Sequence, residues 1–249
     1  MARPKITLYV DTVSPFAYEA YYVLRHDPVF KNCDVTYVPI FLGGLMHKCG
    51  NTPPLKIKNK DKWINAERLR WAGYFSIPMT TGLPPDFPAN TLPVMRALCA
   101  IAASDTQQAQ QQQQPRLTRA LDALFARHWV DAVATHKPEV LKQTLVGLFG
   151  EAETEKIQGR ASYDGTSNYW MVANRRATAI VLAEASTTGK KALLENTDKA
   201  FAEGAFGLPW MVCTNTRGET EGFWGVDHLG QVVQFLGLRK DGNPWRALL

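Results

Sequence analysis

Residues 6–16, Ile-Thr-Leu-Tyr-Val-Asp-Thr-Val-Ser-Pro-Phe, constrain the fold of this chain more than any other stretch. Residues 6–10 are apolar and partly β-branched, which predicts a short buried strand. Ser14 stands where a helix N-cap belongs, and Pro15 takes the first helical position, where a missing N–H costs nothing. A strand that leads into a helix in this way places the serine hydroxyl beside free backbone N–H groups. That arrangement favours binding of an anion such as a thiolate.

A second segment, near the other end of the chain, bears on the role of this serine. On residues 6–16 alone, the roles of ordinary helix cap and anion ligand both remain open. Residues 205–212 read Ala-Phe-Gly-Leu-Pro-Trp-Met-Val, a Gly-x-Pro turn that enters an apolar strand. In thioredoxin-like folds, a strand-to-helix start and a cis-proline ahead of a later strand meet in space. The two segments are similar to that pair and predict that Ser14 lies close to Pro209.

The composition is that of a globular chain with a sizeable core. The 249 residues are 45% hydrophobic and 20% charged. Lysine and arginine number 28 against 23 acidic residues, a net charge of +5 that suits a small anionic ligand. There is no arginine-rich run with interleaved aromatic residues, so we expect no nucleic-acid partner.

The four cysteines, Cys33, Cys49, Cys99 and Cys213, are widely scattered. They form no C-x-x-C motif and have no Cys/His spacing typical of a metal site. We therefore expect reduced thiols and no bound metal.

The location of the protein is expected to be intracellular. The first strand begins directly after the first few residues, which leaves no room for a signal peptide. No apolar run approaches the roughly 20 residues that cross a bilayer, so we expect no membrane partner. The cytoplasm is the first expectation. Residues 245–249 resemble a peroxisomal tail only loosely, and the peroxisome and the mitochondrion remain alternatives.

Residues 35–40 predict a second strand, parallel to the first because a helical crossover joins the two. Gly43 and Gly44, followed by residues 49–54, interrupt any regular pattern and predict a loop that carries function. Asn51 in this loop either closes an Asx-turn or contacts a ligand, and the two roles are compatible. The alternating lysines that follow, among them Lys60, are typical of a solvated surface, although one of them could reach a ligand carboxylate.

The middle of the chain is predicted to be helical. Apolar residues recur at helical spacing from residue 63, with helices expected at 94–103, 117–128, 141–148, 169–185 and 190–202. The glutamine tract at 107–114 is predicted to be an exposed link. Strands 210–214 and 221–224, around a turn at 215–218, resume the sheet, and a last helix begins at Val226. The fold class is therefore α/β. Residues 1–60 and 199–249 form one domain, interrupted by an all-helical insertion at 61–198.

Four motifs together resemble one known family. They are residues 11–16 (Asp-Thr-Val-Ser-Pro-Phe), 50–54 (Gly-Asn-Thr-Pro-Pro), 206–209 (Phe-Gly-Leu-Pro) and 223–227 (Phe-Trp-Gly-Val-Asp). Their order and placement are similar to those of the kappa-class glutathione transferases and the related 2-hydroxychromene-2-carboxylate isomerases. Both belong to the DsbA-like branch of the thioredoxin fold. The resemblance extends over nearly the whole chain and implies a thioredoxin-like (DsbA-type) domain with a large helical insertion.

The resemblance also implies a glutathione site. Ser14 would hydrogen-bond the sulfur of bound glutathione as the catalytic residue, with Pro15 and Phe16 contributing the start of the helix beside it. Asn51 and Lys60 would hold the glycine end of the tripeptide.

The other end of the tripeptide would meet residues near the C-terminus. Leu208, ahead of a cis Pro209, would pair its backbone with the cysteinyl amide of glutathione. Val226 and Asp227 would lie at the N-terminus of the last helix, with Asp227 binding the γ-glutamyl ammonium group. A carboxylate that only caps its helix is the alternative for Asp227.

Two positions depart from the family pattern. His228 stands where the family usually has arginine, and Val226 where a small polar residue is frequent. Val226 can still offer its N–H, whereas His228 leaves the choice of substrate open. The glutamine tract is also unlike the family.

The expected activity is transfer of glutathione to a small hydrophobic electrophile, with glutathione as substrate or cofactor. A glutathione-dependent isomerase that adds the thiolate reversibly is the first alternative, and a non-catalytic glutathione-binding protein is the second. A disulfide oxidoreductase is disfavoured because Ser14 and Ala17 occupy both positions of a C-x-x-C pair. The resemblance also implies a homodimer, which Trp63, Trp71 and Phe75 favour as apolar groups that need cover.

Overall fold

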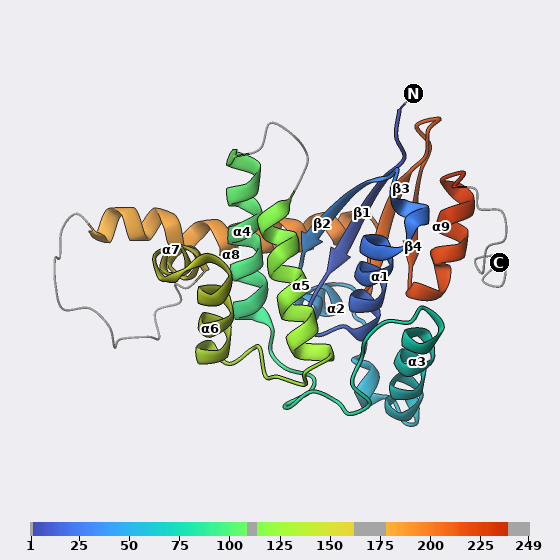
Figure 1. The fold of residues 1–249 in the computed structure, drawn as a ribbon, viewed down its shortest axis with the longest axis horizontal. Coiled ribbons are helices and arrows are strands. Elements are labelled where there is room, and N and C mark those ends of the chain that lie inside the picture. The colour runs from blue at the N-terminus through green and yellow to red at the C-terminus, as the bar shows by residue number, and fades with distance from the viewer. Residues whose placement is uncertain (1, 109–113, 162–177, 239–249) are drawn as a thin grey trace.

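The computed structural model of the protein describes residues 2–108, 114–161 and 178–238. Within them lies a four-stranded sheet with the strand order β2-β1-β3-β4 (Figure 1). The strands are β1 (Lys5–Val10), β2 (Asp34–Pro39), β3 (Trp210–Thr214) and β4 (Thr220–Trp224). β1 and β2 are parallel, whereas β3 is antiparallel to both β1 and β4. The predicted first and second strands, their parallel pairing and the C-terminal hairpin are confirmed.

Helices cover both faces of the sheet. Figure 1 shows α1 (Pro15–His26) in front of the strands and α8 (Thr178–Ala202) passing behind them. The short η1 (Pro28–Phe30) follows α1, and η3 (Val226–His228) and α9 (Leu229–Phe235) follow β4. The predicted last helix is confirmed, with the difference that its first turn is a 3₁₀ turn. Leu229, Val232 and Val233 of this helix and its C-cap residue Leu236 are all buried.

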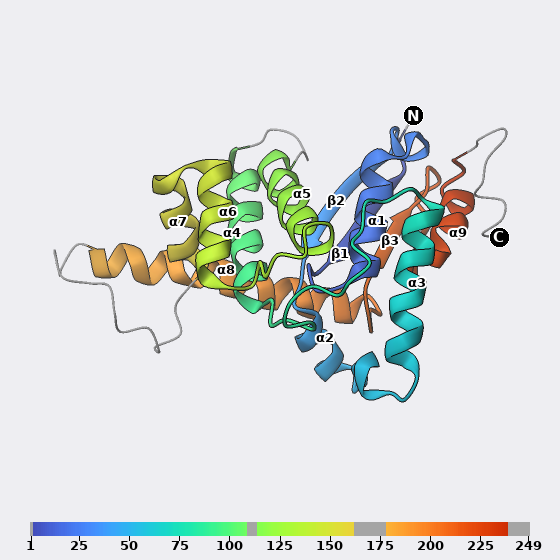
Figure 2. The same cartoon turned by 60° about the horizontal axis from the view of Figure 1, so that its bottom comes forward.

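The remaining helices lie between β2 and α8, and all except the first two fall in the predicted helical region. They are α2 (Leu42–Lys48), η2 (Pro54–Lys56), α3 (Lys60–Tyr74), α4 (Leu92–Gln108), α5 (Pro115–Trp129), α6 (Pro138–Phe149) and α7 (Glu151–Ala161). Figure 2 shows α4, α5, α6 and α7 gathered to one side of the sheet, whereas α3 packs near α1 on the other side. An α/β fold with a helical insertion is therefore confirmed. The division at residues 61 and 198 stays a prediction.

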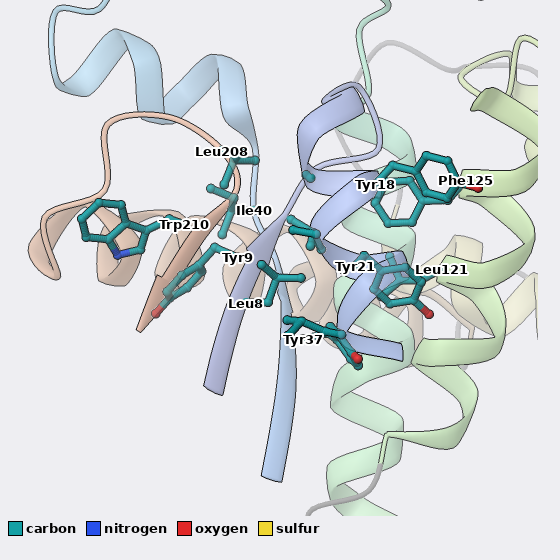
Figure 3. Close-up of a cluster of buried hydrophobic side chains, with 14 of the residues drawn as sticks. Leu8, Tyr9, Tyr18, Tyr21, Tyr37, Ile40, Leu121, Phe125, Leu208 and Trp210 are labelled. Carbon is teal, nitrogen blue, oxygen red and sulfur yellow. The ribbon is translucent and has the colours of Figure 1, made fainter. Parts of the chain in front are cut away.

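Aromatic side chains join the helical region to the α/β part. The rings of Tyr18 and Tyr21 from α1 lie 5.3 and 5.2 Å from the ring of Phe125 in α5. Figure 3 shows these rings on the outer face of α1, with Leu8 and Tyr9 of β1 on the other side of that helix. Because aromatic rings bury large areas, this cluster fixes α5 against α1 and forms one continuous core.

Two predicted helices are wrong in their bounds. Residues 190–202 are the second half of α8, which begins at Thr178, and they form no helix of their own. Of the predicted helix 169–185, residues 169–177 lie outside the described residues and the rest belongs to α8. One glycine inside a helix costs about 1 kcal/mol. Gly189 does not end α8, because the packing of α8 against α4 and α7 outweighs this cost. Helix α7 was not predicted.

The interruption predicted at Gly43 and Gly44 is also wrong, since both residues lie inside α2. A side chain on Gly43 would meet the ring of Phe41 at 3.0 Å, and one on Gly44 at 3.2 Å. The glycines therefore leave room for this ring against the helix, and they do not break it.

One residue of the glutamine tract has a structural role that the prediction of an exposed link missed. Gln107 and Gln108 end α4, and residues 109–113 lie outside the described residues. The side-chain amide of Gln114 donates to the carbonyl of Tyr37 at 2.9 Å and accepts from its N–H at 2.8 Å. Gln114 thus pairs with the outer edge of β2 as a strand residue would.

Candidate active site

Ser14 lies in a tight turn between β1 and α1, here called the Ser14 turn (residues 11–14). Its N–H donates to the carbonyl of Asp11 at 3.1 Å. Its backbone is extended, with φ −89° and ψ 115°, and its Oγ accepts from the N–H of Ala17 at 3.1 Å. The predicted N-cap with Pro15 at the first helical position is therefore confirmed. The side chain of Ser14 is only 5% exposed.

The start of α1 keeps two donors available for a ligand. Pro15 has no N–H, and the N–H of Ala17 is taken by Ser14. Among the residues that the structure describes, neither the N–H of Phe16 nor the hydroxyl proton of Ser14 has an acceptor. Both donors stand at the positive end of a twelve-residue helix, which favours a bound anion.

The cis-proline segment lies beside the Ser14 turn. β3 pairs with β1 so that Trp210 is opposite Tyr9, and continuing this register brings Pro209 next to Val10. The Leu208–Pro209 peptide bond is cis, as predicted. Pro209 accepts from the N–H of Gly225 at 3.0 Å, whereas in the described chain the N–H and carbonyl of Leu208 pair with no other backbone group. The backbone of Leu208 is thus free to pair with an extended ligand.

Gly225 connects this segment to the predicted Asp227 site. It has φ 95°, and the carboxylate of Asp227 packs against it where any side chain would stand. Asp227 is exposed, and Nδ1 of His228 lies 3.3 Å from its Oδ2. Val226 is buried and begins the 3₁₀ turn that leads into α9. A carboxylate therefore stands against Gly225, which is bound to Pro209, the residue after Leu208.

Asn51 and Lys60 behave differently from each other. Nδ2 of Asn51 donates to the carbonyl of Phe206 at 2.8 Å, which ties the loop after α2 to the segment that precedes Leu208. Lys60 begins α3 and is exposed. Sequence reasoning did not foresee the Asn51 contact, because its partner is 155 residues away.

Sequence reasoning missed a buried tryptophan that holds the Ser14 turn and a buried arginine that packs against this tryptophan. Trp129 is fully buried, and its Nε1 donates to the carbonyl of Thr12 at 2.9 Å. The guanidinium of Arg68 lies 5.8 Å from the Trp129 ring and donates to the carbonyls of Thr80, Thr81 and Gly82. An arginine on a helix normally indicates a solvated face, so no pattern in the sequence marks this one as buried.

A third buried residue, Glu19 on α1, has no pairing partner in the described chain. Neither oxygen of its carboxyl group has a hydrogen-bond partner, and burial raises its pKa to about 9 against the opposing charge of Arg68. Glu19 is therefore protonated at neutral pH. It lies among apolar helix residues in the sequence, which is the one signal that could have indicated its burial.

The model of the DSBA-like thioredoxin domain family matches residues 5–157. The chain belongs to this family. Its curated relatives include "Glutathione S-transferase kappa 1" of Caenorhabditis elegans, 25% identical over 241 residues that cover 94% of this chain and 91% of the relative. The protein of the same name from Rattus norvegicus is 25% identical over 93% of this chain and 90% of its own. The resemblance predicted from the four motifs is confirmed.

Solved structures show the same DSBA-like fold. The structure of 2-hydroxychromene-2-carboxylate isomerase has a TM-score of 0.65 at 19% identity and covers 94% of both chains. The "Cytosolic disulfide reductase DsbM from Pseudomonas aeruginosa with GSH" has a TM-score of 0.52 at 12% identity, over 94% of this chain and 96% of that one.

A cavity of about 760 Å³ in this DSBA-like domain lies away from Ser14. It runs along the outer edge of β2, where Arg3, Arg25 and Tyr37 line it. Arg3 and Arg25 are paired there with Asp34 and Asp122, respectively. None of the residues predicted to bind a ligand lines this cavity.

Among the described helices, none combines the length and apolar character that a membrane crossing needs.

Proposed function

We propose that the protein is a glutathione-dependent enzyme that transfers glutathione to a small hydrophobic electrophile. One observation carries the proposal. The free donors of Ser14 and Phe16 stand at the start of α1, beside a cis-proline segment whose Leu208 backbone is unpaired within the described chain. The curated relatives named glutathione S-transferase kappa support glutathione as the substrate, and the named DsbM structure was solved with the same tripeptide.

Glutathione would lie in an extended conformation along residues 206–209. Its cysteinyl amide would pair with Leu208, which directs the thiol towards Ser14 and the N–H of Phe16. Its γ-glutamyl ammonium would meet Asp227, and its α-carboxylate the N–H of Val226. Its glycine carboxylate would meet Lys60 and the second N–H of the Asn51 amide, because the first is used by Phe206.

The chemistry proposed for Ser14 is stabilisation of the thiolate. A free thiol has a pKa of about 8.5, so only a few per cent is ionised at neutral pH. Donors at a helix N-terminus favour the anion, and a drop in the thiol pKa of about 2 units makes the thiolate the main species at neutral pH. The thiolate then attacks the electrophilic carbon. A C–S bond forms, and the displaced electron pair leaves with the leaving group or moves onto a conjugated carbonyl and takes a proton from water.

Isomerisation is the second candidate function, because the 2-hydroxychromene-2-carboxylate isomerase shares this fold over 94% of both chains. In that reaction the thiolate would add to a conjugated carbonyl compound, permit rotation about the saturated bond, and leave again. Glutathione would be regenerated in each cycle. A protein that binds glutathione without turnover is the third candidate.

Free thiol measured against product distinguishes these three functions. The protein is incubated with glutathione and a panel of electrophiles that includes haloarenes and cis-configured conjugated carbonyl compounds. Thiol loss equal to product formed supports transfer, and product at constant thiol supports isomerisation. Binding of glutathione without product from any member of the panel would leave only the third candidate. Absence of glutathione binding would contradict all three.

A further inference from the structure

Asp11 is a fully buried carboxylate in the Ser14 turn that the proposed chemistry does not use. Its carbonyl accepts from the N–H of Ser14 at 3.1 Å, and its Oδ1 accepts from the N–H of Val13 at 3.1 Å. Its Oδ2 accepts from the N–H of Leu42 at 2.9 Å. One residue therefore holds the Ser14 turn at two points and binds a second element across 31 positions of sequence.

The second element is α2, and Asp11 supplies the cap that α2 lacks. Leu42 is the first residue of α2, and the preceding residue, Phe41, makes no side-chain cap bond. A carboxylate at the first turn of a helix satisfies an unpaired N–H and interacts favourably with the helix dipole. The position of α2 is thus set by the same side chain that shapes the Ser14 turn.

Helix α2 in turn leads to the far end of the candidate site. It ends at Lys48, and Asn51 follows, with its amide bound to the carbonyl of Phe206. Phe206 stands two residues before Leu208. Hydrogen bonds and a short helix therefore join Ser14, Asp11, α2 and the Leu208 segment into one frame. A shift at Asp11 would change the distance between the serine hydroxyl and the backbone of Leu208.

Asp11 carries its charge at neutral pH. Burial raises its pKa to about 6, and the hydrogen bonds from Leu42 and Val13 oppose that rise. Both carboxylate oxygens are thus acceptors under neutral conditions. Backbone N–H groups of Val13 and Leu42 stabilise this charge. Because these donors belong to the backbone, the bonds fix the positions of the two segments.

We propose that Asp11 is a positioning residue that sets Ser14 and α2 in register, so that Ser14 meets the sulfur of a glutathione held by Leu208. The inference rests on the proposed function for its ligand but concerns a residue that touches no part of that ligand. It predicts that loss of the Asp11 carboxylate impairs thiolate formation more than it impairs glutathione binding.

The direct test is Asp11→Asn with Asp27→Asn as a matched control. The carboxylate of Asp27 accepts from the N–H of Val29, two residues further on, at 2.8 Å. Asp11 makes the same kind of bond to Val13, but Asp27 lies at the other end of α1. Asparagine at position 11 has an NH2 group in place of one carboxylate oxygen. That group would face the N–H of Val13 or Leu42 and could not accept from it. We expect the pKa of the bound thiol, read from the ultraviolet absorbance of the thiolate, to rise. We also expect kcat to fall about 10-fold, with a smaller change in KM. Asp27→Asn should match the wild type in both.

A second pair of variants tests the hydrogen bond from Leu42 to Asp11 by changing its donor, and leaves the residues of the Ser14 turn unchanged. Leu42→Pro removes the N–H that Asp11 accepts, at a first helical position where proline is tolerated. Leu42→Ala removes the same side chain but keeps the N–H. We expect the thiolate pKa to rise in Leu42→Pro relative to Leu42→Ala.

Hydrogen exchange of the ligand-free protein separates this inference from the proposed function. Asp11→Asn should speed exchange in residues 11–18 and 41–48 but not in β3. If exchange and the thiolate pKa both match the wild type, the positioning role is overturned. If exchange rises while the thiolate pKa and kcat stay unchanged, Asp11 only stabilises the fold. If the wild type binds no glutathione, the proposed function fails and a positioning role fails with it, whatever the exchange result.

Discussion

At the scale of single residues, the buried carboxyl group of Glu19 makes the stability of this protein depend on pH. Its pKa is about 9 in the folded protein, against an ordinary value of 4.5. A carboxyl group whose pKa is raised by folding contributes its full stabilisation of the native state at pH values below its ordinary pKa. That stabilisation is lost as the pH rises towards the pKa of the group in the folded protein. The native state thus loses about 3 kcal/mol between pH 4 and pH 7 from this group.

Glu19→Gln should therefore stabilise the protein at neutral pH and leave it little changed near pH 4. Glutamine is nearly isosteric and does not ionise in the unfolded chain, so the pH-dependent loss disappears. Urea unfolding at several pH values measures the effect as a difference between variant and wild type. The pKa of Asp11 is also raised by burial, but its effect on stability is the same in the variant and the wild type and cancels in this difference. A difference that does not grow between pH 4 and pH 8 would show that Glu19 ionises freely in the folded protein.

The carboxylate of Asp227 is expected to bind the ammonium group of glutathione. Asp227→Asn exchanges a charge-assisted hydrogen bond for a neutral one and should weaken binding by roughly 1–3 kcal/mol. Calorimetric titration with glutathione measures this change. His228→Gln is the matched control, because it removes the imidazole 3.3 Å from Asp227 while leaving the carboxylate in place. Equal affinity of Asp227→Asn and the wild type would mean that Asp227 only stabilises the start of the last helix.

At the scale of elements, the Ser14 turn is held by a helix that lies more than 100 residues further along the chain. Trp129 of α5 donates to the carbonyl of Thr12. Trp129→Phe keeps most of the ring but leaves this buried carbonyl without its donor, which should cost about 1–3 kcal/mol of unfolding free energy. Thermal or urea unfolding measures the loss. Trp63→Phe is the control, because Trp63 is 54% exposed. Equal stability of Trp129→Phe and the wild type would contradict a structural role for the bond.

The elements that the sequence predicted well are those with a clear local signal. The strand before Asp11, the Ser14-Pro15 helix start and the C-terminal hairpin each combine apolar periodicity with a specific turn or cap. The error at α2 occurred where two glycines indicated a break. At α8, packing against α4 and α7 carries one helix through the point where two were predicted. The hydrogen bonds of Asp11, Asn51 and Trp129 were out of reach because each joins residues far apart in the chain.

At the scale of the whole molecule, the protein is predicted to be a homodimer. Large apolar side chains remain exposed, among them Trp63, Phe206 and Trp224. The rings of Phe206 and Trp224 contact each other at a tilt, with centres 4.9 Å apart. Exposed apolar groups of this size favour burial against a partner. Size-exclusion chromatography with light scattering should give twice the chain mass at micromolar concentration. A single species at the mass of one chain would contradict the dimer.

The functional account as a whole depends on Ser14 acting as a hydrogen-bond donor to the glutathione sulfur. The most direct measurement is the thiolate absorbance of the glutathione complex, titrated against pH in the wild type and in Ser14→Ala. The account predicts a higher midpoint in Ser14→Ala, turnover about 10- to 1000-fold lower, and a much smaller change in glutathione affinity. Equal midpoints together with equal turnover would contradict it and would leave Ser14 as the cap of its helix.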